Sequence, residues 1–329
     1  MTAVSAEPVP SMPAPVEEIA DVLAAATAVT ICCHTRPDAD TIGSGLALGV
    51  ALRRRGAAVQ VSFPSPAQLP EPLAGLPGVD LLVAPEDVVG TDVVVTVDCA
   101  SAERIGLLDK HFYAASTRIV IDHHVSNAGY GTVNLVDGDA SCTAELILMV
   151  LDAMDVALDA DLATCLYAGL VTDTGSFKWG GPQSHRTAAR LLEAGVDGRE
   201  WTRRLLDTHQ FLWLTMVSKV LATAVLVPEA FDGAGLVYAV VDQVTAAGMS
   251  WEQAESVVDI VRTTAEAEVA VVFKETSPNR WSVSMRSKTQ IDLVPVARAA
   301  GGGGHRHAAG FTSEGTVDEV VASFVATAV

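Results

Sequence analysis

Basic residues are scarce in this 329-residue sequence. The 21 lysines and arginines stand against 40 acidic residues, which gives a formal net charge of −19. This balance excludes a broad basic face for long nucleic acid, so an anionic substrate would have to be held locally by metal ions and a few arginines. Charged residues make up 19% of the chain and hydrophobic residues 50%, which is typical of a globular protein and excludes a disordered one.

Cysteines and long apolar runs are also scarce. The five cysteines lie in apolar segments of the first half without CxxC spacing, which predicts buried, reduced thiols and argues against a zinc knot or a disulfide framework. No apolar run is long enough to span a bilayer, and the first 20 residues carry acidic groups where a signal peptide would be apolar. We therefore expect a cytoplasmic protein with no membrane partner, in which residues 1–15 form a flexible tail.

The first half alternates short apolar runs with amphipathic segments. The expected strands are 28–33, 58–63, 92–98 and 118–122, and the expected helices are 41–55, 140–154 and 159–171. Such alternation predicts an α/β domain with a parallel sheet, right-handed crossovers and helices on both faces. We assign residues 16–190 to this domain and expect it to carry the chemistry.

The second half predicts a separate core. Residues 191–226 have a helical pattern and are expected to connect two domains. Residues 227–329 then resume with expected strands at 235–241, 268–274 and 281–286, a helix near 251–264 and a loop of four glycines at 301–304. This predicts a smaller α/β domain.

Acidic and imidazole side chains stand at the ends of four apolar runs. They are His34, Asp38 and Asp40 after the first run, Asp98 after the second, Asp122, His123 and His124 after the third, and Asp173 at the end of a helical stretch. Strand ends of an open parallel sheet meet at its carboxyl edge, so these groups are expected to converge. Several carboxylates with two or more imidazoles suit a pair of hard divalent cations, the arrangement used to hydrolyse phosphate esters.

The donor set also predicts which ions bind. Carboxylate-rich sites with one or two imidazoles favour manganese or magnesium over zinc, and we expect two Mn²⁺ ions, with Mg²⁺ as a substitute. Two cations about 3.5 to 4 Å apart can acidify a water and clamp phosphoryl oxygens, so no serine or cysteine nucleophile is required. Asp122 could be a ligand or could orient an imidazole from outside the ligand set, and His124 is expected to face the substrate or the attacking water.

The glycine-rich segment near the C-terminus suggests an anion site. Four consecutive glycines let backbone N–H groups approach an anion, and His305 could donate to a phosphate or a base. Arg262, Ser284 and Arg286, with Lys288, add a small basic patch, and arginine suits bidentate phosphate contacts. The alternative reading is a flexible turn beside solvated charges.

Five segments in order resemble the DHH phosphoesterase family. HTRPDADTIGS, VDCAS, IDHH and VTDTGSF are similar to its four successive motifs, and GGGGHRHAAGF is similar to the signature of the DHH-associated domain. The resemblance runs from about residue 16 to the C-terminus. The two-domain length most resembles the nanoRNase and 3′-phosphoadenosine 5′-phosphate phosphatase branch.

The resemblance, together with the spacing, implies a role for each residue. The first ion would be held by His34 and Asp38, the second by Asp40, His123 and Asp173, and Asp98 would bridge the two. The catalytic residues would be Asp98, His123 and His124. The substrate-binding residues of the second domain would be Arg262, Ser284, Arg286, Gly303, Gly304 and His305.

The resemblance also implies an activity. It is the manganese-dependent degradation of short oligoribonucleotides and linear dinucleotides such as pApA to nucleoside monophosphates, and the dephosphorylation of 3′-phosphoadenosine 5′-phosphate to AMP. Some members of the branch also cleave cyclic di-AMP. We expect a cleft between the two domains to select short substrates, and, by analogy with relatives, a homodimer.

Three alternatives stay open at this stage. A manganese-dependent inorganic pyrophosphatase is the closest rival, although its second domain lacks the GGGGH signature. A processive exonuclease of the RecJ type would have an additional nucleic-acid-binding domain. A non-catalytic dinucleotide sensor would keep the binding residues without turnover.

Overall fold

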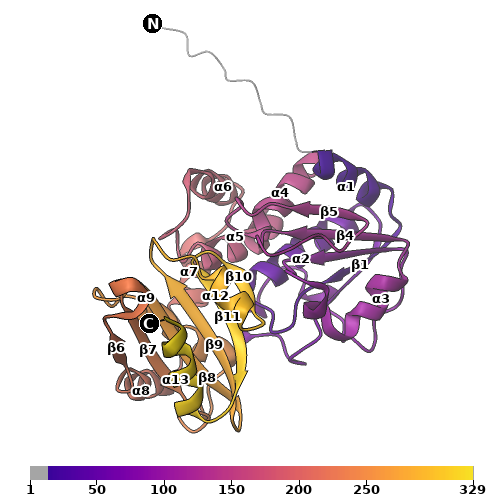
Figure 1. Cartoon of the computed structure of the whole chain (residues 1–329). Coiled ribbons are helices and arrows are strands. Elements are labelled where there is room, and N and C mark those ends of the chain that lie inside the picture. Colours follow the sequence, from indigo (N-terminus) through magenta and orange to yellow (C-terminus); the bar gives the residue numbers. More distant parts are fainter. Residues whose placement is uncertain (1–13, 329) are drawn as a thin grey trace, which may run out of the picture. The chain divides into compact units, whose positions relative to one another are not determined.

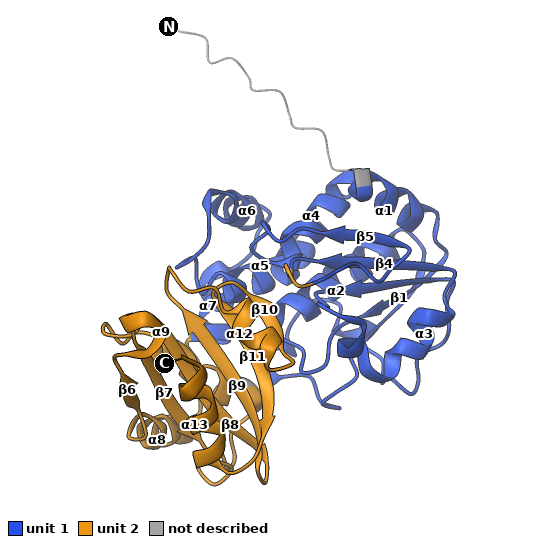
Figure 2. Cartoon of the chain, in the orientation of Figure 1, with its two compact units in different colours: residues 1–123, 127–206 blue, residues 124–126, 207–329 orange. Residues whose placement is uncertain are grey.

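A computed structural model describes residues 14–328. They form two compact units (Figure 2): unit 1 runs through His123 and resumes at Asn127–Leu206, and unit 2 takes His124–Ser126 and the chain from Asp207 onward. The change from unit 1 to unit 2 at Leu206 falls within the segment for which a connector was predicted. Except for its last two positions, the predicted tail at residues 1–15 lies outside the described residues.

Unit 1 contains the predicted all-parallel sheet (Figure 1), with strand order β2-β1-β3-β4-β5. The strands are β1 (Ala28–Cys32), β2 (Ala58–Ser62), β3 (Val93–Val97), β4 (Thr117–Asp122) and β5 (Val133–Val136). The sequence did not indicate β5, because four residues including Asn134 are too short and too polar to stand out as an apolar run. The α/β fold class predicted for this half is confirmed.

Helices cover both faces of this sheet. The helices of unit 1 are α1 (Ala14–Ala25), α2 (Ala39–Arg54), α3 (Asp109–Ala114), α4 (Thr143–Ala153), α5 (Ala160–Asp173), α6 (Pro182–Glu193) and α7 (Gly198–Leu206), with 3₁₀ segments η1 (Glu71–Leu73), η2 (Val79–Leu81) and η3 (Ala102–Leu108); α6 and α7 pack against α5. Val95 and Ile119 pack in one cluster with α1, α2, α4 and α5, whereas Val94 and Val120 pack in another with η3 and α3. Because both faces are buried, the central strands have continuous apolar sequences.

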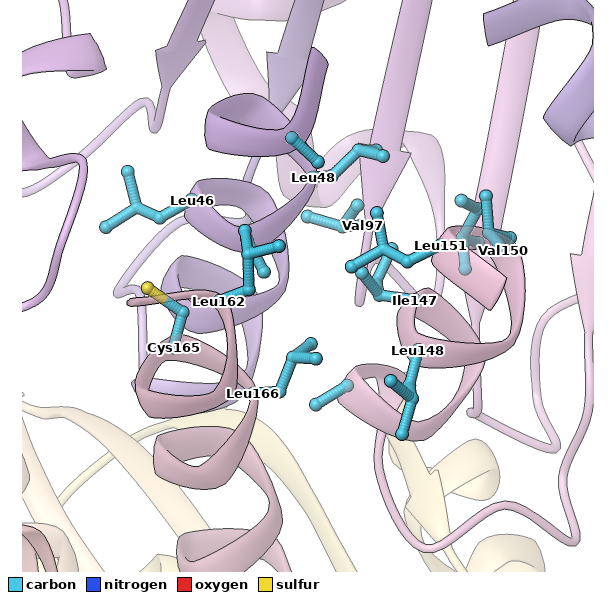
Figure 3. Close-up of a cluster of buried hydrophobic side chains, with 14 of the residues drawn as sticks. Leu46, Leu48, Val97, Ile147, Leu148, Val150, Leu151, Leu162, Cys165 and Leu166 are labelled. Atoms are coloured by element: carbon cyan, nitrogen blue, oxygen red, sulfur yellow. The ribbon is translucent and has the colours of Figure 1, made fainter. Parts of the chain in front are cut away.

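The larger cluster joins helices that are far apart in the sequence. Figure 3 shows Leu46 on α2 near Leu162 and Leu166 on α5, with Ile147 of α4 close to Val97 of β3. All of these side chains are buried. Their packing fixes the helices that begin or end beside the carboxyl edge of the sheet.

Glycine allows α2 and α5 to pack closely. A Cβ atom at Gly43 would lie 2.2 Å from the carbonyl oxygen of Cys165, and a Cβ atom at Gly169 would lie 2.4 Å from Oδ1 of Asp40. Both distances are far below van der Waals contact. These two positions therefore set the distance between the helices.

Unit 2 contains a six-stranded mixed sheet of order β10-β11-β9-β8-β7-β6, in which β7 and β8 are parallel and the other pairs antiparallel. The strands are β6 (Val225–Val227), β7 (Leu236–Val241), β8 (Val269–Ser277), β9 (Arg280–Ser287), β10 (Gly303–His305) and β11 (Ala308–Glu314). The helices are α8 (Phe211–Leu221), α9 (Ala230–Gly233), α10 (Trp251–Glu255), α11 (Val257–Val261), α12 (Val294–Ala299) and α13 (Val317–Ala328). The predicted second α/β domain is confirmed.

Two local predictions in unit 2 were wrong. The glycine run was expected to be a loop, but Gly303 and Gly304 belong to strand β10, which pairs with β11. A Cβ at Gly302 would lie 2.0 Å from the carbonyl oxygen of Gly310, so the glycine there is required by close backbone packing. The helix expected near 251–264 is divided into α10 and α11.

The remaining expectations concern cysteines and membranes. All five cysteines are buried and none takes part in a disulfide. No helix among residues 14–328 has both the length and the apolar composition needed to cross a bilayer. The cytoplasmic location stays a prediction.

Replacing Gly43 by alanine tests the close contact of α2 with α5. At an open helical position, alanine would add up to about 1 kcal/mol to the free energy of unfolding. At Gly43 we expect a loss of about 2 kcal/mol, because the new methyl group meets backbone atoms that cannot rotate away. Urea denaturation measures the difference. Gly90→Ala is the control, since a Cβ atom there meets nothing within 4 Å, and an equal, small effect in both variants would contradict the expectation.

Candidate functional site

The loop between β1 and α2 carries three of the predicted ligands. Asp38 caps α2, with its Oδ1 accepting from the backbone N–H groups of Asp40 and Thr41 at 3.1 Å each. The hydroxyl of Thr41 donates to the carbonyl oxygen of Val97 at 2.9 Å, which ties the loop to the end of β3. His34 is buried and Asp38 is exposed. A helix cap and one hydroxyl thus hold the loop against the sheet.

Asp98 follows β3 directly in a conformation that is unusual for a side chain other than glycine. Its φ of +59° lies in the left-handed region, where an L-residue is strained unless its surroundings hold it. Its backbone N–H donates to Ile121 at 3.0 Å, and the hydroxyl of Thr143 donates to Oδ1 at 3.1 Å. The carboxylate is therefore held at the sheet edge from both the backbone and the side chain.

Asp98 lies between two imidazoles. Nε2 of His34 is 3.3 Å from Oδ2 of Asp98, and Nε2 of His123 is 3.5 Å from Oδ1. Each imidazole faces a second carboxylate: His34 lies 3.4 Å from Oδ2 of Asp38, and His123 lies 3.4 Å from Oδ2 of Asp173. One carboxylate with an oxygen toward each imidazole is the arrangement expected of a bridging ligand.

Two groups made up only of predicted metal ligands share Asp98. His34, Asp38 and Asp98 form one group, and Asp40, Asp98 and His123 form another, with the ligand atoms of each group within 4.8 Å of one another. Unit 1 thus brings together all six residues for which the sequence suggested metal binding. Asp173 stands outside both groups, with its Oδ2 at 3.4 Å from Nε2 of His123, and the assignment of these residues to two ions stays a prediction.

Asp40 is held by the N-terminus of α4. Its Oδ2 accepts from the backbone N–H of Thr143 at 2.6 Å, and its Oδ1 accepts from Ala144 at 2.9 Å and from the hydroxyl of Ser44 at 3.3 Å. A helix N-terminus stabilises a carboxylate through its free N–H groups and its dipole. The sequence analysis missed these supporting residues, because residue 143 is about a hundred positions away from Asp40.

A hydrogen bond at Nδ1 of His123 would leave its Nε2 available for a metal ion. Its Nδ1 lies 3.3 Å from the carbonyl oxygen of Ala140, to which an Nδ1–H would donate. This leaves the Nε2 lone pair directed at Asp98 and Asp173. Asp122 is buried and accepts from the side-chain amide of Asn127 at 2.7 Å.

The pKa values indicate an excess of negative charge in this group. Burial, together with Asp98 and Asp38, raises the pKa of Asp40 well above its usual value. Burial and Arg104 act to lower the pKa of His34, but Asp38 and Asp98 outweigh them and raise this pKa to about 9. Burial opposes ionisation of Asp38, yet His34 keeps the pKa of Asp38 below its usual range. The raised pKa values of Asp40 and His34 favour bound protons, which divalent cations would replace.

Arg104 is a site residue that the sequence analysis did not identify. It lies in η3, six residues after Asp98, and its Nη2 is 2.9 Å from Nδ1 of His34. The backbone N–H of Thr35 donates to the carbonyl oxygen of Arg104 at 2.8 Å. No motif pointed to it, because a single arginine in a loop is common.

The predicted basic patch of unit 2 contains a carboxylate at its centre. The hydroxyl of Ser284 donates to Oε1 of Glu255 at 2.7 Å, and Nη2 of Arg286 lies 3.9 Å from the same oxygen. The buried Lys274 donates to both Glu255 and Ser284 and lies over the ring of Trp251. Glu255 thus offsets part of the positive charge that the sequence indicated.

The other predicted substrate-binding residues lie in two separate segments of unit 2. Arg262 follows α11 and has Asp259 as an ion-pair partner at 3.5 Å. Gly303, Gly304 and His305 form the half-buried strand β10, and Gly304 has a φ of +139°. His124 directly follows His123, is half-buried and is grouped with unit 2.

Comparisons with known proteins give two family matches. Residues 28–170 match the model of the DHH family, N-terminal domain, and residues 233–328 match the DHHA1 domain. A Thermus thermophilus protein named bifunctional oligoribonuclease and PAP phosphatase NrnA is 32% identical over 303 residues, which cover 90% of this chain and 88% of the relative. A Bacillus subtilis protein of the same name is 28% identical and covers 84% of this chain and 86% of the relative.

Solved structures share the fold. An exopolyphosphatase-related protein from Bacteroides fragilis superposes with a TM-score of 0.82 at 23% identity and covers 94% of both chains. RecJ from Thermus thermophilus, solved in complex with Mn²⁺, gives a TM-score of 0.53 at 17% identity over 95% of this chain and 54% of that one. At these identities, the likeness establishes the two-domain architecture.

The raised pKa values of His34 and Asp40 predict how Mn²⁺ binding depends on pH. His34 must lose a proton before Nε2 can bind a metal, and so must the fraction of Asp40 that its raised pKa keeps neutral. Binding therefore releases protons, and the association constant should rise with pH by at least about tenfold per unit between pH 6 and 8. Electron paramagnetic resonance of free Mn²⁺ measures the constant. The surface variant Asp80→Asn should keep this slope, and an affinity independent of pH would contradict the expectation.

Proposed function

The chain belongs to the DHH family, and on that premise we propose that it is a manganese-dependent phosphoesterase acting on very short oligoribonucleotides. Its substrates would be linear dinucleotides such as pApA, cut to nucleoside monophosphates, and 3′-phosphoadenosine 5′-phosphate, dephosphorylated to AMP. Hydrolysis of phosphoester bonds accords with the names of its oligoribonuclease and PAP phosphatase relatives. Hydrolysis of cyclic di-AMP is proposed as a further activity.

The observation that carries this proposal is the position of Asp98 between His34 and His123, each imidazole facing a further carboxylate. By this geometry His34 and Asp38 would hold one ion. Asp40, His123 and Asp173 would hold the other. Oxygen donors with two imidazoles suit Mn²⁺ or Mg²⁺ better than Zn²⁺. When bound, the ions would supply positive charge for the phosphoryl oxygens and an acidified water as the attacking group.

The chain's own residues keep this donor set in place. Thr143 holds Asp98, the N-terminus of α4 holds Asp40, and the carbonyl of Ala140 directs His123. Fixed ligands reduce the reorganisation that accompanies the reaction. We assign His124 to hydrogen bonding with the substrate or the attacking water, so that it acts with Asp98 and His123 as a catalytic residue.

Unit 2 is proposed to bind the part of the substrate that does not react. Arg262, Ser284 and Arg286 would hold a phosphate or ribose oxygen, and the backbone of Gly303 and Gly304 with His305 would contact a phosphate or a base edge. Lys274 and Glu255 hold the hydroxyl of Ser284 in a fixed orientation. The net charge of −19 disfavours any long nucleic acid that would extend beyond these contacts.

A substrate panel tests the function. With Mn²⁺, we expect turnover of pApA and 3′-phosphoadenosine 5′-phosphate, slower turnover of cyclic di-AMP and of a twenty-nucleotide RNA, and no turnover of pyrophosphate. Chelator should abolish all activity, and Asp98→Asn should lower kcat by about 10²- to 10³-fold, because it removes the shared carboxylate charge. The surface variant Asp80→Asn is the control. Fastest turnover of pyrophosphate would identify a pyrophosphatase, and binding of pApA without phosphate or AMP release would identify a sensor.

We also propose that the protein is a homodimer that uses the apolar face of α8. Phe211, Leu214 and Leu221 are 84%, 57% and 38% exposed, and Val225 and Leu226 of β6, the edge strand that follows α8 in the chain, are 43% and 41% exposed. Several large exposed apolar residues on one helix and the strand that follows it suit an interaction surface. We expect Leu214→Glu to shift the mass measured by light scattering from dimer to monomer. Val89→Glu, at an exposed position of unit 1, should leave it unchanged, and a monomeric wild type would contradict the proposal.

A further inference from the structure

We propose that Arg104 binds the phosphoryl group of the substrate. This inference rests on the proposed function and adds a residue to it. The guanidinium of Arg104 is half-buried beside the donor cluster, and Nη2 lies 2.9 Å from Nδ1 of His34. Within residues 14–328, no carboxylate oxygen lies within 4.0 Å of this guanidinium. A half-buried cation without a carboxylate partner suits an anionic ligand.

The contact of Arg104 with His34 competes with another hydrogen bond. Nδ1 of His34 also lies 2.8 Å from the carbonyl oxygen of Thr35. A carbonyl oxygen can only accept, and a guanidinium can only donate. Nδ1 satisfies Thr35 when it carries a proton and satisfies Arg104 when it presents its lone pair, so it cannot serve both at once.

When Nδ1 donates to Thr35, Arg104 faces an N–H in place of an acceptor. The guanidinium then has no acceptor on the imidazole of His34, and an anion beside it would supply one.

Arg104 can then turn to an anion without moving its backbone. Its carbonyl oxygen accepts from the N–H of Thr35 at 2.8 Å, which anchors the residue to the loop that carries His34. The side chain has several rotatable bonds, and its planar fork matches two phosphoryl oxygens. A phosphoryl group beside the Asp98 cluster would be the nearest anion able to accept from it.

The opposing interpretation is that Arg104 only positions His34. The two interpretations differ in Mn²⁺ affinity, because a positioning residue would be needed for metal binding, whereas a competing donor would not. Arg104→Met removes the charge and the donors but keeps a long side chain, and Arg104→Lys keeps the charge without the fork. Arg55→Met is the matched control, since Arg55 is an exposed arginine of unit 1 that donates to the carbonyl oxygen of Met154.

The experiment measures Mn²⁺ affinity, by electron paramagnetic resonance without substrate, and kcat and KM for pApA. For Arg104→Met we expect Mn²⁺ affinity equal to or tighter than wild type, with kcat/KM lowered about 10- to 100-fold, the worth of a charged hydrogen-bonding pair. Arg104→Lys should recover part of this loss, and Arg55→Met should match the wild type.

Two results would overturn the inference. One is a kcat/KM within threefold of wild type in Arg104→Met, and the other is a loss of Mn²⁺ affinity as large as the loss of activity. Either result with an active wild type rejects the role of Arg104 alone. A wild-type protein that hydrolyses no phosphoester rejects the proposed function and this inference with it.

Discussion

Buried negative charge at the carboxyl edge of the first sheet is the constraint on which the structure of unit 1 depends. Asp40, Asp98 and Asp122 are almost completely removed from solvent, and carboxylates in such surroundings are costly unless donors or cations surround them. The fold supplies the N-terminus of α4 to Asp40 and the hydroxyl of Thr143 to Asp98. Gly169 lets α5 pass beside Asp40, where any larger residue would meet its carboxylate. The hydrogen bonds and close packing around these carboxylates therefore determine where α4 begins and how α2 and α5 pack.

The positions of the candidate ligands at the carboxyl edge of this sheet could be predicted well from the sequence. Buried parallel strands have continuous apolar sequences, so the ends of β1, β3 and β4 could be located closely. Polar residues that follow such strands must lie at one edge of the sheet. The convergence of His34, Asp98 and His123 follows from this topology and does not depend on the details of loop conformation. The motif order then linked the same residues to the DHH family.

Other features depend on pairings that the sequence does not encode locally. Lys274 lies in a strand that looks like any apolar run, and only folding brings Glu255 of a separate helix against it. Arg104 lies beside His34 only because η3 contacts the loop that holds His34. The glycine run predicted a loop, whereas close backbone packing against Gly310 makes it an edge strand. Secondary-structure propensity describes the preference of a single residue, whereas these features depend on contacts with residues distant in the sequence.

The supporting donors also limit the repulsion among the carboxylates. The N-terminus of α4 and the hydroxyl of Ser44 donate hydrogen bonds to Asp40, and such donors stabilise a buried carboxylate. The left-handed backbone of Asp98 is held in a similar way, because its N–H donates to Ile121 and its side chain accepts from Thr143. Substitutions of these supporting residues would therefore change the geometry of the candidate site, although none of them is a predicted ligand.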